Sequence, residues 1–115
     1  MSDRVLIINR IAAIVEPKEP YLAWARALDG DDPSIDSLSA EDLTSVYLID
    51  EDENAERSLQ RNWAWIFEEK LYSWHRERKA WPPKRTYKVF REWFDVRLVD
   101  LVFDLSDESL VHEEF

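Results

Sequence analysis

A chain of 115 residues forms one domain, long enough to fold around a single hydrophobic core. Hydrophobic residues make up 45% of it and charged residues 35%, a composition that predicts a globular protein and excludes an intrinsically disordered one. The formal net charge of −10 repels nucleic acid and anionic lipid at long range. The absence of cysteine excludes disulfides, thiolate chemistry and cysteine-ligated zinc.

The sequence carries no signal for a membrane or for export. No window approaches the roughly 18 uninterrupted apolar residues that a spanning helix needs. The opening MSDRVLII holds one cation and a short apolar run without a small-residue cleavage site, so a signal peptide is not expected. We therefore expect a protein of a reducing cytosol that does not bind membranes.

The first half of the chain predicts two strands around one helix. Residues 5–16 are apolar and rich in β-branched side chains, which predicts a strand. Pro20 suits the first turn of a helix, which the pair Asp29 and Gly30 ends. A polar connection then leads to residues 44–50, TSVYLID, which predict the second strand.

The second half predicts a long helix, a short helix and a strand. The acidic residues 50–53 lead into a helix over residues 54–79, and the cations at its end complement the helix dipole. Two prolines stop this helix, and a shorter aromatic helix follows at residues 86–94. Residues 95–105 alternate between apolar and polar side chains, which predicts the last strand.

The order of these elements predicts an α+β fold. A small sheet of about three strands, packed with one long and two shorter helices, is the economical two-layer arrangement. We expect residues 5–105 to form the ordered core of a single domain, 1–115. The acidic residues 106–115 are expected to form a mobile tail.

Three segments together resemble a known group of proteins: NRIAAIVEPKEPYLAW, WPPKRT and FREWFDV. The chain is similar over residues 9–103 to small bacterial proteins that open with a strand ending in a Pro-Lys turn. The resemblance implies a compact domain of the bacterial cytosol. No activity is assigned to that group, so the resemblance implies no functional residue.

Most catalytic and metal-binding motifs are missing from the sequence. A single glycine excludes Gly-rich phosphate loops, dinucleotide fingerprints and the nucleophile elbow. The two histidines, His75 and His112, lie far apart and have no second ligand at helical spacing. We therefore expect no metal site and no cofactor.

Paired carboxylates leave an enzyme as an alternative. Asp100 and Asp104 share one face of the predicted last strand, where their Cα atoms are about 13 Å apart. Catalytic pairs of glycosidases are about 5–9.5 Å apart, so these two do not form one. Pairs between different elements stay open, and an enzyme would place a cleft around acids such as Glu92, Asp95 or Asp100.

The long helix has aromatic residues on two faces. Its core stripe consists of Leu59, Trp63, Ile66, Phe67, Leu71 and Trp74. Trp65 and Tyr72 share the opposite face, with Arg61 and Arg76 flanking them. The favoured interpretation buries these two rings beneath another element, because a long helix in a small domain is often covered on both sides. The alternative exposes them as a partner-binding surface. Lys70 lies within the core stripe, and we expect its amine to reach solvent or a carboxylate.

Residues 76–91, the basic window, concentrate the positive charge of the chain. The window has a net charge of +6, which leaves −16 on the other 99 residues. Its cations are Arg76, Arg78, Lys79, Lys84, Arg85, Lys88 and Arg91. The window is either a solvated helix end and loop or a binding site for an acidic protein, for nucleic acid, or for the acidic tail of a second copy. The overall negative charge argues against nucleic acid.

The sequence thus predicts a non-enzymatic protein–protein interaction module. The predicted partner-binding residues are Trp65, Tyr72, Arg61, Arg76, Arg78, Lys79, Lys84, Arg85 and Lys88. The partner is expected to be another protein, and a homo-oligomer is open. The alternative is an acidic inhibitor of the immunity or antitoxin type, which would bind a basic toxin through the acids of residues 29–32, 50–53 and 104–114. An enzyme with carboxylates from different elements is the third class.

Overall fold

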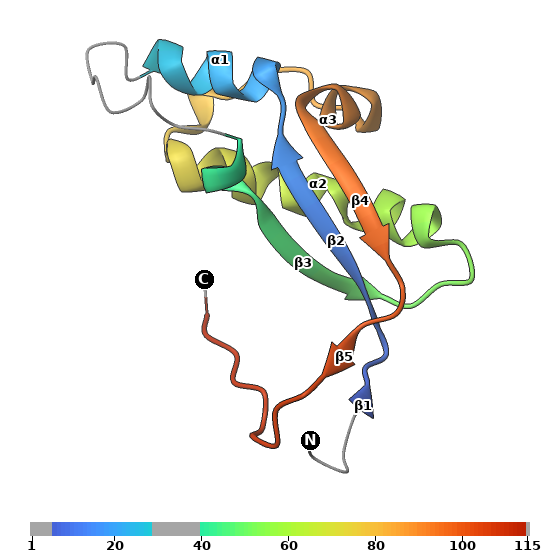
Figure 1. Cartoon of the computed structure of the whole chain (residues 1–115). Coiled ribbons are helices and arrows are strands. Elements are labelled where there is room, and N and C mark those ends of the chain that lie inside the picture. The colour runs from blue at the N-terminus through green and yellow to red at the C-terminus, as the bar shows by residue number, and fades with distance from the viewer. Residues whose placement is uncertain (1–5, 29–39, 115) are drawn as a thin grey trace.

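The computed structural model describes residues 6–28 and 40–114 and confirms the predicted α+β fold class (Figure 1). The elements in chain order are β1 (Leu6–Ile7), β2 (Arg10–Pro17), α1 (Glu19–Leu28), the 3₁₀ turn η2 (Glu41–Leu43), β3 (Ser45–Asp50), α2 (Ala55–Trp74), the 3₁₀ turn η3 (Arg78–Ala80), α3 (Tyr87–Trp93), β4 (Phe94–Val99) and β5 (Phe103–Asp104). The predicted end of the first helix at Asp29 and Gly30 lies outside the described residues.

The main sheet is antiparallel, with strand order β3-β2-β4. The central strand β2 has a neighbouring strand on each side, and its sequence is a nearly continuous apolar run, as is typical of a strand in that position. Its residues Ile11, Ala13 and Val15 are buried toward the helices, and Ala13 lies opposite Tyr47 of β3 and Leu98 of β4. Figure 1 views the sheet from its other side, and α2 crosses behind β2 and β3.

An aromatic cluster joins the helices to the sheet. The ring centroid of Phe67 in α2 lies 5.9 Å from that of Phe90 in α3 and 5.5 Å from that of Phe94 in β4. Tyr21 of α1 lies 5.2 Å from Phe94, and its hydroxyl donates to the backbone carbonyl of Lys70 at 2.8 Å. Tilted and edge-on rings at these separations add about 0.5–1.5 kcal/mol per pair beyond the area that they bury.

The sequence predicted the core face of α2 correctly. Leu59, Ile66, Phe67 and Leu71 are buried, and Trp63 and Trp74 pack against them. The side chain of Asn54 caps the helix by accepting the N–H of Glu56 at 3.1 Å. One face of α2 therefore binds the helix to the sheet along its whole length.

The predicted C-terminal end of the long helix, Lys79, is wrong, because α2 ends at Trp74. The Trp74 indole N–H donates to the carbonyl of Ala25 in α1, at 3.1 Å. The backbone of His75 is extended, and its carbonyl accepts the indole N–H of Trp81 at 2.7 Å. These tertiary hydrogen bonds end the helix before the prolines do. The last turn of α2 consequently holds no basic residue, and the predicted complement to its dipole is absent.

The first and last predicted strands are each divided in two. Residues 5–16 form β1 and β2, and residues 95–105 form β4 and β5, as far as the structure describes them. β1 pairs with β5 in an antiparallel ribbon, with Leu6 opposite Asp104 and Ile7 opposite Phe103. In Figure 1 this ribbon projects from the sheet in continuation of β2 and β4.

Candidate functional site: an aromatic groove on α2

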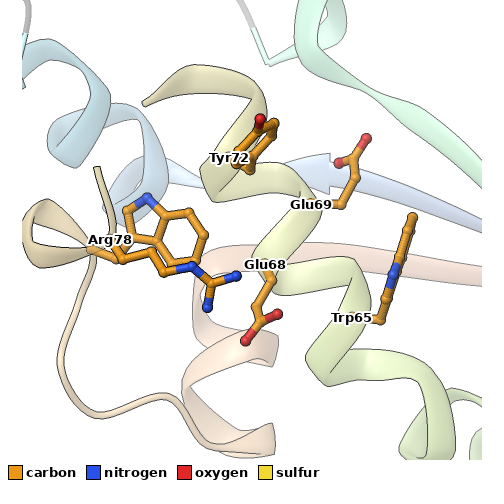
Figure 2. Close-up of a pocket in the computed structure, with 6 residues that line it drawn as sticks. Trp65, Glu68, Glu69, Tyr72 and Arg78 are labelled. Atoms are coloured by element: carbon orange, nitrogen blue, oxygen red, sulfur yellow. The ribbon is translucent and has the colours of Figure 1, made fainter. Parts of the chain in front are cut away.

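A groove lies between the outer face of α2 and the segment that follows this helix (Figure 2). It has a volume of about 220 Å³, and it is lined by Trp65, Glu68, Glu69, Tyr72, Arg78 and Trp81. Trp65 is 58% exposed and Tyr72 is 41% exposed. The favoured interpretation, which buried both rings, is therefore wrong, and the alternative of an exposed aromatic face is confirmed.

The geometry of α2 explains why the two rings share one line. Trp65 and Tyr72 are seven residues apart, which returns a helix to the same angular position. The main sheet holds the opposite side of α2, so this side faces outward. Trp65 leans edge-on against Tyr47 of β3, with ring centroids 6.3 Å apart. In Figure 2, Trp65 stands at one end of the groove and Arg78 at the other.

Two carboxylates line the groove between the rings. Glu69 accepts the hydroxyl of Tyr47 at 2.7 Å. Burial, and then this hydrogen bond, raise the pKa of Tyr47 far above its usual value, so Tyr47 is a neutral donor at every physiological pH. Glu68 lies 3.7 Å from the guanidinium of Arg85. Glu69 is therefore held by a hydrogen bond from the sheet, whereas Glu68 forms only a long ion pair at the surface.

The basic window supplies the second wall of the groove. The guanidinium groups of Arg78 and Arg85 lie 5.2 Å and 5.6 Å from the ring centroid of Trp81, and that of Arg76 lies 5.5 Å from the ring of Tyr72. Cations over aromatic faces at these distances are stabilising. The two surfaces that the sequence suggested separately, the aromatic face and the basic window, thus meet in one place.

The other cations of the window lie elsewhere. Arg91 donates to Glu56 and to the hydroxyl of Tyr87, each at 2.9 Å, which ties α3 to the start of α2. Lys79 is exposed and lies 3.7 Å from Glu77. Lys84 and Lys88 are exposed and do not line the groove. Part of the basic window therefore stabilises the fold, and part of it is solvated surface.

Sequence reasoning missed three residues of the groove. Glu68 and Glu69 follow Trp65 at i+3 and i+4, and this helical spacing was a sufficient signal to place them beside Trp65. Trp81 is only 5% exposed, and no local pattern in the sequence places it opposite Trp65.

Arg61 belongs to a different cluster from the one predicted. Its guanidinium donates to Asp52 at 2.9 Å and also to Asp50, so it binds the connection between β3 and α2. The amide of Asn62 and the guanidinium of Arg61 hold the pKa of Asp50 far below its ordinary value of 3.8. The pKa of Asp52 is lowered by the backbone N–H of Asn54 and then by Arg61. Arg61 therefore stabilises the start of α2 and does not line the groove.

The ion pairs of Arg61 with Asp50 and Asp52, which we call the Arg61 cluster, predict that the fold loses stability in acid. Lowered carboxyl pKa values contribute stability that is complete above the unfolded-state pKa and is lost as the pH falls through the folded-state value. For Arg61→Gln, we expect the urea midpoint to fall below that of the wild type at about pH 6, and the difference to shrink below about pH 4. Lys84→Gln, which removes a cation outside this cluster, is the control. A difference independent of pH would contradict the assignment.

Lys70 is buried, and the prediction that its amine reaches solvent or a carboxylate is wrong. Only 4% of the residue is exposed. Its amine donates to the carbonyl of Leu43 at 2.5 Å and to the hydroxyl of Ser45 at 2.8 Å, and it lies 5.9 Å from the ring centroid of Tyr47. Burial lowers the pKa of Lys70. A carbonyl, a hydroxyl and a ring face all favour a cation, which makes Lys70 a structural ammonium group.

Comparison with known proteins identifies no family for this chain. No protein-family model, no curated protein and no solved structure matches the chain. The resemblance of residues 9–103 to small bacterial proteins stays a prediction. A function must therefore be argued from the residues themselves.

Two further findings concern the described residues. Within residues 6–28 and 40–114, no three His, Asp or Glu side chains are grouped so that they could hold a metal ion. No helix in the same ranges combines the length and the apolar character needed to cross a bilayer.

Two of the three acids named for an enzyme, Asp95 and Asp100, lie in separate hollows. Asp95 shares one with Glu16 and Arg97, and its volume is about 170 Å³. Asp100 lines another of about 330 Å³ together with residues 51–53, which are far from it in the sequence. We call this second hollow the acidic recess. It gathers negative charge from the β3–α2 connection and from the end of β4 in one place.

Proposed function

We propose that this protein is a non-enzymatic interaction module that binds another protein through the groove on α2. The observation that supports this proposal is the exposure of Trp65 and Tyr72 beside Arg78 and the edge of Trp81. Trp, Tyr and Arg are the residues that contribute most binding energy at protein interfaces. The cysteine-free composition and the resemblance to bacterial proteins support a bacterial cytosol as the location.

The size of the groove indicates what it receives. Ligand pockets for whole small molecules have volumes of about 300–1,000 Å³, and the groove has about 220 Å³. This volume suits one large side chain of a partner. The aromatic walls favour an apolar or aromatic anchor. The carboxylate of Glu68 and the guanidinium of Arg78 can then pair with polar groups that flank it.

The test compares the wild type with Trp65→Ala/Tyr72→Ala. Each chain is used as bait in native lysate, the bound protein is identified and purified, and its dissociation constant is measured by calorimetry. Loss of each hot-spot ring costs about 2 kcal/mol, so we expect the double variant to bind more weakly by a factor on the order of 1,000. Because both rings are exposed, the variant is expected to fold, and thermal unfolding checks this.

A matched control is Leu110→Ala/Val111→Ala, which truncates two exposed apolar residues outside the groove. It is expected to bind the partner as the wild type does. The proposal would be abandoned if the groove variant bound the partner with unchanged affinity, or if no chain captured any protein in stoichiometric amount.

The acidic recess favours a second candidate, the inhibitor of a basic toxin. Residues 51–53 and Asp100 form a concentrated negative surface, which accelerates association with a basic partner. This candidate predicts that Glu51→Gln/Glu53→Gln weakens binding while Trp65→Ala/Tyr72→Ala does not. It also predicts a steep loss of affinity with salt, which an aromatic anchor in the groove does not show.

A further inference from the structure

The side of the main sheet that faces away from the helices carries an apolar strip between charged residues. Ile14 of β2 lies beside Val46 of β3, and Ala12 lies between Leu48 of β3 and Val99 of β4. Val46 is 60% exposed and Leu48 is 45% exposed. When one face of an antiparallel sheet is solvated, its outward residues are normally polar. An apolar strip across all three strands is the pattern of a surface that another layer covers.

The ribbon of β1 and β5 extends this surface. It continues β2 and β4 directly, and the N–H of Ile8 donates to the carbonyl of Val102 at 2.9 Å where the ribbon leaves the sheet. The large apolar side chains of its strands and of the residues beside β5 are between 48% and 70% exposed: Leu6, Ile7, Leu101, Phe103 and Leu105. An isolated two-stranded ribbon is marginally stable in water. The ribbon therefore needs a neighbour.

The shape of the molecule agrees with this requirement. The radius of gyration is 16.3 Å, and the extents are 52 × 30 × 23 Å. A compact domain of about 100 residues has a radius of roughly 13 Å. In Figure 1 the ribbon lies at the end of the long axis. The chain thus carries a projecting apolar arm and an apolar sheet face, which are continuous with each other.

The size of this surface matches what a dimer needs. Ile7 lies opposite Phe103 and Leu6 opposite Asp104, so Leu6 points to the other side of the ribbon. At the observed exposures, Val46, Leu48 and the other four side chains each present on the order of 100 Å², which gives roughly 600 Å² in total. A standard interface buries about 800 Å² on each partner. The surface is therefore large enough for a second protein, and it is much larger than one side chain or one short peptide requires.

The distribution of charge favours a second copy as the occupant. On the outward side of the sheet, Arg10 and Arg97 balance Glu16 and Asp95, and the charge of Asp50 is paired with Arg61. The outward side of the sheet is therefore close to neutral, and β5 adds the charge of Asp104, although the chain as a whole carries −10. Two copies that meet through this surface bring few like charges together. We propose that the outward face of the sheet and the β1–β5 ribbon form the interface of a homodimer, in which each ribbon packs on the partner's apolar surface.

This dimer has a characteristic dependence on salt. An apolar interface between two chains of −10 is opposed by long-range repulsion, which salt screens. Association is therefore expected to become stronger as the salt concentration rises. Pairing of the basic window with the acidic tail of a second copy would become weaker instead.

The test is sedimentation equilibrium of the full chain at low and high salt. We expect a dimer, tighter at high salt. In Val46→Thr/Leu48→Thr, which places a residue that favours strands at both positions, the dissociation constant is expected to rise on the order of 30-fold. Trp65→Ser/Tyr72→Ser is the matched control in the groove, and its dimer is expected to be unchanged. This control separates the dimer from the proposed partner site, since either can fail without the other.

Three results would overturn the dimer. The first is a monomer at every accessible concentration. The second is a dimer that salt weakens or that Val46→Thr/Leu48→Thr leaves intact. The third is a monomer that dimerises only after residues 106–115 are removed, which would assign the apolar face to the chain's own tail. A thermal unfolding curve for each variant confirms that a change in mass is not a loss of fold.

Discussion

Replacement of Phe67 by alanine is expected to lower the free energy of unfolding by about 3–5 kcal/mol. Phe67 is completely buried, and its ring lies 5.9 Å from Phe90 and 5.7 Å from Trp93, both in α3. It also lies 5.5 Å edge-on from Phe94 in β4. One side chain of α2 thus contacts two other elements, and its loss leaves a cavity between them that no single movement can fill. Urea denaturation measures the difference.

Two comparisons make this prediction specific. Phe67→Leu keeps most of the volume and is expected to cost clearly less than Phe67→Ala. Trp65→Ala removes a larger ring from the same helix, but on its exposed side, and it is expected to change the free energy of unfolding by only about 0.5 kcal/mol. If Trp65→Ala cost as much as Phe67→Ala, the assignment of the two faces of α2 would be wrong.

Lys70→Ala is expected to cost on the order of 3 kcal/mol. The substitution removes a buried aliphatic stem and leaves the carbonyl of Leu43 and the hydroxyl of Ser45 without their donor. Lys70→Met keeps the stem and removes the buried charge, so it is expected to stay within about 1.5 kcal/mol of the wild type. Equal losses in the two variants would show that the hydrogen bonds outweigh the packing of the stem.

The pH dependence tests the charge of Lys70 separately. Its folded-state pKa is lower than the unfolded value of 10.5, so between these two values the unfolded chain binds more protons. The stability of the wild type relative to Lys70→Met should therefore rise with pH in this range. Tyr21 and Tyr47 have raised pKa values and destabilise the fold above about pH 10 in both chains. The comparison of the two chains removes most of that shared effect.

Core and candidate site depend on the same helix. Phe67 and Leu71 fix α2 against the sheet, and Trp65 and Tyr72 stand on its opposite side. A variant that loosens the core also moves the groove, so binding measurements require variants on the exposed side alone. For this reason the stability variants and the binding variants proposed above share no residue apart from Trp65, whose small expected cost is itself tested.

The sequence by itself determined the fold class and the two faces of α2. Apolar residues at helical spacing from Leu59 to Trp74 identify the buried side of a helix, whatever packs against it. The same periodicity places Trp65 and Tyr72 on the opposite side. Strands β2 and β3 follow from their apolar and β-branched residues, and β4 follows from the alternation of apolar and polar side chains. These patterns extend over only a few residues, and each is enough to favour a helix or a strand without any contact from the rest of the chain.

Only the tertiary structure decided how the elements end and what covers them. The long helix stops at Trp74 because the indoles of Trp74 and Trp81 donate to carbonyls that no local pattern connects with them. Arg61 turns to Asp50 and Asp52, and the amine of Lys70 reaches Leu43, because the folded sheet brings these groups within hydrogen-bonding distance. Local periodicity selects a helix and its apolar side, but the neighbours of each side chain depend on how the whole chain packs. The exposure of the groove follows from that packing, since the sheet covers one side of α2 and leaves the other side exposed.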